Sequence, residues 1–233
     1  MKLKQKKIQG IPVICWGEPS EKIILAFHGD QSHKEDPVIQ FLADVATKKG
    51  YQVWSFDLPE HGERKGQDYA LNPQNVVADV NKILLELEKQ AARIALFGCS
   101  IGAYFSMLTC QNRSIEQSLF LSPIVDMQKL IENIMRWSDL TPTDLRQKKI
   151  IETPIKTLEW EYYSYVVDHP ITSWTAPTAI LYGGQDTLTE RGTIETFAAA
   201  PQISLTIFEA GEHFFHTPDQ LQVYQQWLEK KLK

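Results

Sequence analysis

Short apolar runs alternate along the chain with segments of helical periodicity. Runs of four to six largely apolar residues predict buried strands at residues 11–16, 22–27, 51–56, 94–97, 118–121, 178–182 and 203–208. Apolar residues spaced three and four apart predict helices at residues 37–49, 72–87, from 103 onward, 189–199 and 218–232. Strand and helix alternating at this spacing indicate βαβ units, a mostly parallel sheet and the α/β class.

The alternation stops between residues 124 and 174. Helical segments are expected at residues 125–137, after Thr141 and at residues 154–167, and no further strand of the main sheet is visible there. Residues 1–233 are therefore interpreted as a single α/β domain, with residues 124–174 as a helical insertion.

Composition and charge narrow the classes of partner. The formal net charge of −5 argues against binding nucleic acid, and no apolar run approaches the roughly 20 residues of a membrane span. The N-terminal lysines precede no apolar segment, so we expect a solvated strand edge and no secretion signal. Cys15, Cys99 and Cys110 lack metal-ligand spacing, and reduced thiols in a cytoplasmic protein are the simplest account.

The strongest chemical signal lies in residues 93–108. An apolar strand-like run leads into Gly-Cys-Ser-Ile-Gly at residues 98–102, and an apolar helical run follows. This is the G-x-S-x-G pattern in its strand–turn–helix context, in which a sharp turn holds the serine hydroxyl out of the sheet. Glycine is needed on either side because a Cβ there would collide with the neighbouring strand or helix. Ser100 is therefore the candidate nucleophile.

An acid and a base follow in the order that such a nucleophile requires. Asp186 comes just after the strand at 178–182, and His213 just after the strand at 203–208. His213 would take the proton of Ser100, and Asp186 would orient the imidazole. Asp186 alone would also be explained as a cap for the following helix. The weaker candidates are Asp30, Asp126 and Asp168 for the acid, and His216 for the base.

An oxyanion hole needs two backbone N–H donors. Ile101, which follows the nucleophile, is expected to supply one, and Asp30 in the loop after the second strand the other. A carboxylate close to an oxyanion is unfavourable, so the Asp30 side chain is expected to point away or to pair with His33 or Lys34. His28 and His61 are interpreted as residues that hold loops through hydrogen bonds.

These motifs together resemble the α/β-hydrolase-fold serine hydrolases. The resemblance is carried by residues 28–29 (His-Gly), 57–62 (Asp-Leu-Pro-Glu-His-Gly), 98–102, 182–186 (Tyr-Gly-Gly-Gln-Asp) and 211–213 (Gly-Glu-His), which span almost the whole chain. Size and inserted helices look most like small bacterial carboxylesterases of the cinnamoyl-esterase and monoacylglycerol-lipase kind. Residues 59–62 read Pro-Glu-His-Gly, whereas relatives usually have Pro-Gly-His-Gly, so Glu60 stands where a glycine is usual. Dienelactone-hydrolase relatives use cysteine as nucleophile, but Cys99 is not at the centre of the turn.

The resemblance implies hydrolysis of a small carboxylic ester through an acyl-serine, with no cofactor or metal. It also implies that residues 124–174 form a cap over the active site, whose aromatic residues either line an acyl pocket or pack the cap helices. Those residues are Trp137, Trp160, Tyr162, Tyr163 and Tyr165, and we select Trp137, Trp160 and Tyr163 as pocket residues. The same triad also serves thioesterases, acyl-peptidases and C–C hydrolases, and some relatives only bind ligands or act as lipases at membrane surfaces. Acyl length, leaving group and oligomeric state do not follow from the sequence.

Overall fold

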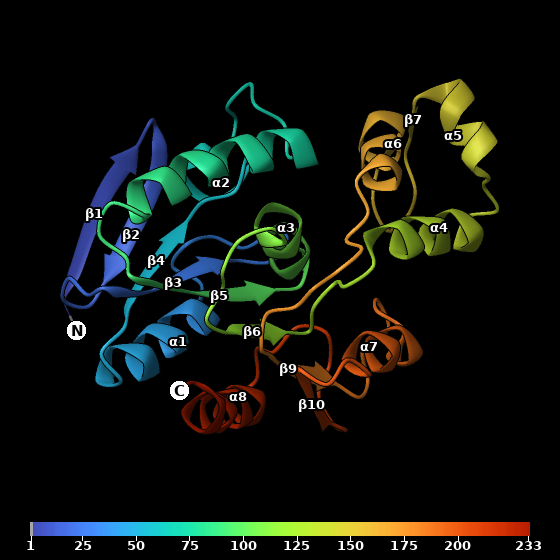
Figure 1. The fold of residues 1–233 in the computed structure, drawn as a ribbon. Helices are drawn as coiled ribbons and strands as arrows, with labels where there is room; N and C mark the ends of the chain where they lie inside the picture. The colour runs from blue at the N-terminus through green and yellow to red at the C-terminus, as the bar shows by residue number, and fades with distance from the viewer. Residues whose placement is uncertain (1) are drawn as a thin grey trace.

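An eight-stranded, mostly parallel sheet with helices on both faces forms the body of the molecule (Figure 1), in a computed structural model that describes residues 2–233. The strand order is β1-β2-β4-β3-β5-β6-β9-β10. The strands are β1 (Leu3–Ile8), β2 (Ile11–Trp16), β3 (Lys22–Phe27), β4 (Gln52–Phe56), β5 (Arg93–Cys99), β6 (Ser118–Leu121), β9 (Thr178–Gly183) and β10 (Ile203–Phe208). Within this sheet, as far as residues 2–233 describe it, only the β1–β2 and β2–β4 pairs are antiparallel. The predicted α/β class is confirmed.

Helices cover the two faces of the sheet in pairs. Helices α1 (Pro37–Lys48) and α8 (Pro218–Lys231) lie on one face, and α2 (Pro73–Leu87) and α3 (Ile101–Cys110) on the other (Figure 1). Each face has its own hydrophobic cluster. Helix α7 (Arg191–Ala198) adds Ile194 to the cluster on the α2–α3 face. The strands run through both clusters, which is why β3 and β9 read as almost continuous apolar runs.

Local sequence signals explain where these helices begin. Helix α2 starts at a proline, and the side chain of Asn72 accepts a hydrogen bond from the N–H of Asn75. Helix α8 starts with a capping box in which Thr217 and Gln220 bond reciprocally. Such caps satisfy N–H groups that have no partner within the helix. The predicted boundaries of both helices are confirmed within one residue.

The segment between β6 and β9 contains three helices and a small hairpin. The helices are α4 (Met127–Trp137), α5 (Pro142–Lys148) and α6 (Trp160–Asp168), and β7 (Ile150–Ile151) pairs with β8 (Leu158–Glu159). In Figure 1 the three helices lie beyond the end of the sheet, at one side of the molecule. We refer to residues 124–174 as the insertion.

The predicted helix over residues 154–167 is wrong in its first part, because α6 begins only at Trp160. The Thr153 hydroxyl accepts hydrogen bonds from the N–H groups of Ile155 and Lys156, which holds this stretch in a turn. A side chain that bonds to the backbone in this way competes with helix formation.

None of the helices formed by residues 2–233 is long and apolar enough to cross a bilayer.

Candidate active site

The turn between β5 and α3 is held by close backbone contacts. A Cβ on Gly102 would lie 2.5 Å from the carbonyl oxygens of Phe27 and His28, and one on Gly98 would lie 2.5 Å from Cα of Ala103. Ser100, between these glycines, has φ of 51° and ψ of −117°. A non-glycine residue in such a conformation costs of order 1–3 kcal/mol and persists only where its surroundings fix it. The close contacts of Gly98 and Gly102 therefore hold Ser100 in this backbone conformation.

Two backbone hydrogen bonds fix Ser100 from either side. Its N–H donates to the carbonyl of Leu121 at 3.0 Å, and its carbonyl accepts from the N–H of Ile124 at 3.1 Å. Both partners belong to the stretch that leaves β6 and enters the insertion. The backbone of the serine and the beginning of the insertion are thus directly joined.

Ser100, His213 and Asp186 form a continuous chain of hydrogen bonds. Oγ of Ser100 lies 2.8 Å from Nε2 of His213, and Nδ1 of His213 lies 2.6 Å from Oδ2 of Asp186. For Nε2 to accept a proton, Nδ1 must carry one, and the carboxylate of Asp186 favours that tautomer. The structure therefore brings together the three residues selected from sequence, in the order that proton transfer requires.

Asp186 also holds its own loop. Its Oδ1 accepts hydrogen bonds from the N–H groups of Leu188 and Thr189 at 2.8 and 2.9 Å, and its side chain is fully buried. Oδ2 pairs with His213, whereas Oδ1 holds the turn between β9 and α7. The alternative of a helix cap is wrong, because α7 begins at Arg191 with Glu190 at its N-cap position. An acid held at both oxygens has little freedom to rotate away from His213.

The loops after β9 and β10 reach each other through their backbones. The N–H of Gln185 donates to the carbonyl of Gly211 at 2.8 Å, and that of Gly184 donates to Phe208 at 2.8 Å. A Cβ on Gly183 would overlap the carbonyl oxygens of Gly211 and Glu212. The glycines beside Asp186 and His213 thus allow the contact that places acid beside base.

The competing acids and base occupy other places. Asp126 caps α4 by accepting from the N–H of Lys129, and Asp168 is the last residue of α6. His216 is exposed, its ring stacks on Phe214, and its Nδ1 lies 2.8 Å from the carbonyl of that residue. Within the described part of the chain, none of these three hydrogen-bonds to the Ser100–His213–Asp186 chain.

The loop after β3 lies beside the serine. A Cβ on Gly29 would stand 3.7 Å from Cβ of Ser100, so Asp30 follows directly after a residue in contact with the turn. Ile101 is the first residue of α3, and its N–H therefore has no acceptor within the helix. These are the two positions predicted for the oxyanion donors.

The Asp30 carboxylate is paired, but with different partners from those predicted. Its Oδ1 lies 3.2 Å from Nε2 of His61, and its Oδ2 lies 2.9 Å from Nζ of Lys156, in the insertion. The hydrogen bond with His61 and the charge of Lys156 hold the pKa of Asp30 well below its usual range. The expected pairing with His33 or Lys34 is wrong, because Lys34 bonds to Asp57.

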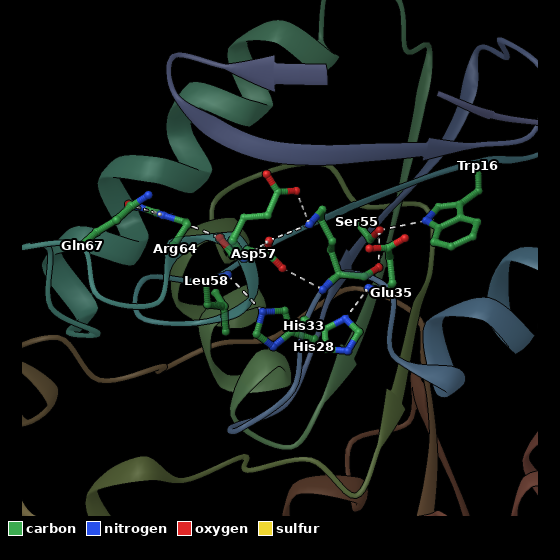
Figure 2. Close-up of polar contacts among 11 residues, drawn as sticks. Trp16, His28, His33, Glu35, Ser55, Asp57, Leu58, Arg64 and Gln67 are labelled. Atoms are coloured by element: carbon green, nitrogen blue, oxygen red, sulfur yellow. Dashed lines mark hydrogen bonds and ion pairs between the residues drawn. The ribbon is translucent and has the colours of Figure 1, made fainter. Parts of the chain in front are cut away.

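A buried polar network holds the loops after β3 and β4 together (Figure 2). Nζ of Lys34 lies 2.8 Å from Oδ2 of Asp57 and 2.7 Å from Oε1 of Glu63, and its N–H donates to Oδ1 of Asp57 at 2.9 Å. His28 accepts from the N–H of Leu58 at 3.0 Å, and burial lowers the pKa of His28 to about 4. His28 is thus a neutral loop-holding residue, as the sequence indicated. The Lys34–Asp57 pair was missed, because the two residues are 23 positions apart.

Glu60 adopts a backbone conformation that favours glycine. Its φ is 62°, in the left-handed region, and its Oε2 accepts from the N–H of Leu71 at 3.0 Å. Relatives usually have glycine at this position. Glu60 keeps the left-handed backbone conformation of the turn and adds a side chain to it. Glu60 thereby adds a carboxylate at the wall of the cavity described next.

Ser100 and His213 open onto a cavity of about 780 Å³. One side of this cavity is aliphatic and comes mainly from α4, through Met127, Leu130, Ile131 and Ile134. Tyr162, Lys156 and Leu158 line it from the rest of the insertion. Volume and lining are those of a site for a small molecule. We call this space the Ser100 cavity.

Trp137, Trp160 and Tyr163, selected as pocket residues, do not line the Ser100 cavity. Trp137 is 46% exposed. The ring of Trp160 packs on that of Tyr163, whose hydroxyl donates to Glu132 at 2.9 Å. Trp160 and Tyr163 share a helical face that packs within the insertion, and Tyr162 on the adjoining face reaches the cavity. The pocket prediction is corrected to aliphatic residues of α4 and to Tyr162.

Cys99 lines the same cavity beside the serine. Burial raises the pKa of its thiol to about 12. A thiol held protonated in this way is a poor nucleophile. Of the two side chains, Ser100 therefore remains the candidate nucleophile.

Comparison with known proteins agrees with this architecture. The family model for serine aminopeptidase S33 matches residues 18–159. Est1E from Butyrivibrio proteoclasticus with bound ferulic acid superposes with a TM-score of 0.77 at 18% identity, over 97% of this chain and 96% of that one. A putative hydrolase from Agrobacterium vitis S4 gives 0.83 at 15% identity, with both chains covered completely.

A third structure, alpha/beta hydrolase domain-containing protein 10 from mouse, gives a TM-score of 0.77 at 13% identity, over 99% of this chain and 98% of that one. At these identities the likeness shows the α/β-hydrolase fold. A comparison with curated protein sequences finds no match.

Proposed function

We propose that the protein, which belongs to the serine aminopeptidase S33 family of hydrolases, cleaves small carboxylic esters through an acyl-Ser100 intermediate. The observation that carries the proposal is the chain of hydrogen bonds from Ser100 through His213 to Asp186, at the wall of an apolar cavity. The triad needs no other group to activate the serine hydroxyl. The insertion acts as the cap of this site.

In the first half of the reaction, His213 takes the proton of the Ser100 hydroxyl at Nε2 while Oγ attacks the ester carbonyl carbon. The negative charge that forms on the carbonyl oxygen is accepted by the N–H groups of Ile101 and Asp30. The bond to the alcohol oxygen then breaks, and His213 returns its proton to that oxygen. The acyl group remains on Ser100, and Asp186 stabilises the imidazolium while it lasts.

In the second half, water takes the place of the alcohol. His213 removes one proton of the water as its oxygen attacks the acyl carbon, and the same backbone donors accept the charge. The proton returns to Oγ of Ser100 as the acyl–oxygen bond breaks, and the carboxylic acid leaves. Both half-reactions use the same proton path, in which Oγ of Ser100 lies 2.8 Å from Nε2 of His213 and Nδ1 of His213 lies 2.6 Å from Oδ2 of Asp186.

The pairing of Asp30 supports its place in the oxyanion hole. A free carboxylate beside a developing oxyanion would oppose the reaction, because like charges repel each other. Here the Asp30 carboxylate is bonded to His61 and its charge is balanced by Lys156. The backbone N–H of Asp30 can therefore donate to the oxyanion without an unbalanced negative charge beside it.

Labelling and turnover together test the proposal. A fluorophosphonate probe is expected to label Ser100 in the folded protein, and p-nitrophenyl acetate and butyrate to be hydrolysed. Ser100→Ala should abolish both. His213→Ala should reduce kcat by at least about 10³-fold, whereas the matched control His216→Ala should keep kcat.

A panel of esters, thioesters and amides compared by kcat/KM identifies the reacting group. Turnover of thioesters or amides with no turnover of esters would contradict the proposal. Absence of labelling at Ser100 would argue for a protein that binds ligands without catalysis.

A further inference from the structure

Phe214 is a large apolar side chain that a molecule in the Ser100 cavity can reach. It directly follows His213 and lines the cavity, and it is 61% exposed. The next residue, Phe215, is 2% exposed and belongs to the hydrophobic cluster that contains Phe208. Of two adjacent phenylalanines, one is therefore part of the core, and the other leaves its surface free for a ligand.

The ring of Phe214 is held in place although it is exposed. It stacks on the ring of His216, with the ring centroids 5.0 Å apart and the ring planes at 7°. Nδ1 of His216 lies 2.8 Å from the carbonyl oxygen of Phe214, and the N–H of His216 donates to Oε1 of Gln220 at 2.9 Å. Gln220 belongs to the capping box of α8. A ring held in this way loses little conformational freedom when a ligand packs on it.

The loop after β10 gives the cavity an aromatic face beside the base. It contributes His213, Phe214 and Phe215 to the cavity wall. The carboxylate and ammonium side chains of the wall come from the loops after β3 and β4 and from the insertion: Asp30, Asp36, Glu60, Lys156 and Glu159. A group that lies along the loop after β10 therefore meets hydrocarbon surface.

The proposed reaction indicates which half of the substrate lies at this face. His213 returns its proton from Nε2 to the alcohol oxygen, so that oxygen is within about 2.6–3.2 Å of Nε2 when the ester bond breaks. Cα of Phe214 is about 3.8 Å from Cα of His213, because the two residues are adjacent. Of the two halves of the ester, the alcohol is thus the one that begins beside this loop.

We propose that Phe214 forms the subsite for the alcohol half of the ester, and that this alcohol is apolar. The inference rests on the proposed ester hydrolysis for the identity of that half, and on the exposure and position of Phe214 for its apolar character. An alkyl group that packs on the ring removes apolar surface of both partners from water, which favours binding. A polyol or sugar alcohol gains much less from the same contact.

Butyrate esters of different alcohols test the inference by turnover. In the series ethyl, propyl, butyl and pentyl butyrate, we expect kcat/KM to rise by about 2- to 4-fold for each added methylene. The alcohol of 2-ethoxyethyl butyrate has the length of pentanol, with an oxygen in place of one methylene, and its kcat/KM should be about 4-fold or more below that of pentyl butyrate. Since 2-ethoxyethanol is the better leaving group, reactivity alone would give the opposite order.

Phe214→Ala should reduce the rise along the alcohol series to less than about 2-fold for each methylene. Leu85→Ala is the matched control and should keep the wild-type rise, because Leu85 is also 61% exposed but belongs to α2 and does not line the cavity. Ethyl esters from butyrate to heptanoate lengthen the acyl half instead. Phe214→Ala should leave the dependence on acyl length unchanged.

Binding to variants that cannot turn over separates this inference from the proposed function. Affinities for pentyl butyrate and 2-ethoxyethyl butyrate are measured by calorimetry with Ser100→Ala, Ser100→Ala/Phe214→Ala and Ser100→Ala/Leu85→Ala. Tighter binding of pentyl butyrate that is lost only with Phe214→Ala supports the apolar subsite, even if the wild-type protein hydrolyses neither ester.

Three results would overturn the inference. The first is an alcohol series without any rise in the wild type, and the second is a Phe214→Ala variant that changes the acyl series in place of the alcohol series. The third is a loss of the alcohol preference with Ile155→Ala and not with Phe214→Ala, because Ile155 of the insertion also lines the cavity and is 48% exposed. If the esters are hydrolysed in these cases, ester cleavage stands while the role of Phe214 is lost.

Discussion

The loops that hold Ser100, Asp186 and His213 differ from the insertion in what fixes them. In the loops, backbone meets backbone: Gly102 faces two carbonyl oxygens of the loop after β3, and Gln185 donates to the loop after β10. In the insertion, side chains of α4 and α6 pack into the cluster on the α2–α3 face. Close contacts between backbone atoms tolerate few substitutions, whereas contacts between side chains can be altered by replacing the side chains. Under the proposed function, the reaction therefore belongs to the first region and the choice of acyl group to the second.

Asp186→Asn is expected to have the largest effect, because it alters the rigid region without disturbing its shape. The amide oxygen can still accept from Leu188 and Thr189, but the amide group no longer favours the tautomer of His213 with a proton on Nδ1. We expect kcat to fall by about 10⁴-fold. The urea midpoint should stay close to that of the wild type.

Asp186→Ala is the informative companion, since it also removes the acceptor for the two loop N–H groups. Its urea midpoint should be lower than that of Asp186→Asn. Equal urea midpoints would show that the hydrogen bonds to Oδ1 of Asp186 contribute nothing to the stability of the protein.

Gly102→Ala is expected to come next. The added methyl would lie 2.5 Å from the carbonyl oxygens of Phe27 and His28, so the turn and the loop after β3 must separate. A misplacement of about 1 Å is enough to reduce kcat/KM by about 10²-fold. Gly192→Ala, where a Cβ meets nothing within 4 Å, is the matched control and should retain full kcat/KM.

Ile131→Phe probes the insertion, and its effect should be smaller and selective. Ile131 lies in the aliphatic wall of the Ser100 cavity, and a larger side chain there shortens the space for the acyl group. The ratio of kcat/KM for p-nitrophenyl octanoate to that for the acetate should fall by about 10-fold, the scale of one or two methylenes. Trp137→Phe, outside the cavity, should leave the ratio unchanged. A parallel loss on both esters would contradict the division between the two regions.

Lys156→Met should have the smallest effect on kcat, because His61 still bonds to the Asp30 carboxylate in this variant. It removes the ion pair with Asp30 that joins the insertion to the loop after β3, and both side chains are more than a third exposed. Exposed pairs contribute at most about 1 kcal/mol to the free energy of unfolding. Lys156→Arg is the control that keeps the charge.

The pH dependence of the Lys156→Met effect has a definite sign. The folded-state pKa of Asp30 is lowered, so the contribution of the pair is complete above the unfolded pKa of aspartate, about 4, and is lost as pH falls through the folded pKa. The difference in urea midpoint between Lys156→Met and Lys156→Arg should therefore narrow in acid. A difference that grows below pH 4 would contradict the assignment.

The backbone-fixed region was largely predictable from sequence. Glycines at the turn around Ser100 and beside Asp186 mark places where a Cβ would collide, and those collisions are visible in the structure. Strand periodicity placed Asp186 and His213 at strand ends, and ends of parallel strands lie on one edge of a sheet. Local sequence signals were therefore sufficient to predict most of the fold and to predict that the three residues lie close together.

The insertion was less predictable, because its contacts join segments without a shared pattern. Lys156 reaches Asp30 across 126 positions, and the turn that carries it was expected to be helical. Adjacent positions on a helix place Tyr162 and Tyr163 on different faces, but helical spacing alone does not show which of them lines the cavity. That choice depends on Glu132 of α4, which holds Tyr163, and packing between helices fixes it.

The hydrogen bond from the N–H of Ile124 to the carbonyl of Ser100 sets a boundary for exchanging parts between proteins. All three residues of the Ser100–His213–Asp186 chain lie outside residues 124–174, so a foreign insertion could be grafted between β6 and β9 without replacing any of them, provided that it supplies a partner for Asp30 in place of Lys156. The graft would have to begin after Ile124, because the N–H of this residue bonds to the carbonyl of Ser100. Under the proposed function, we expect a chimera cut at this point to take its acyl preference from the foreign insertion.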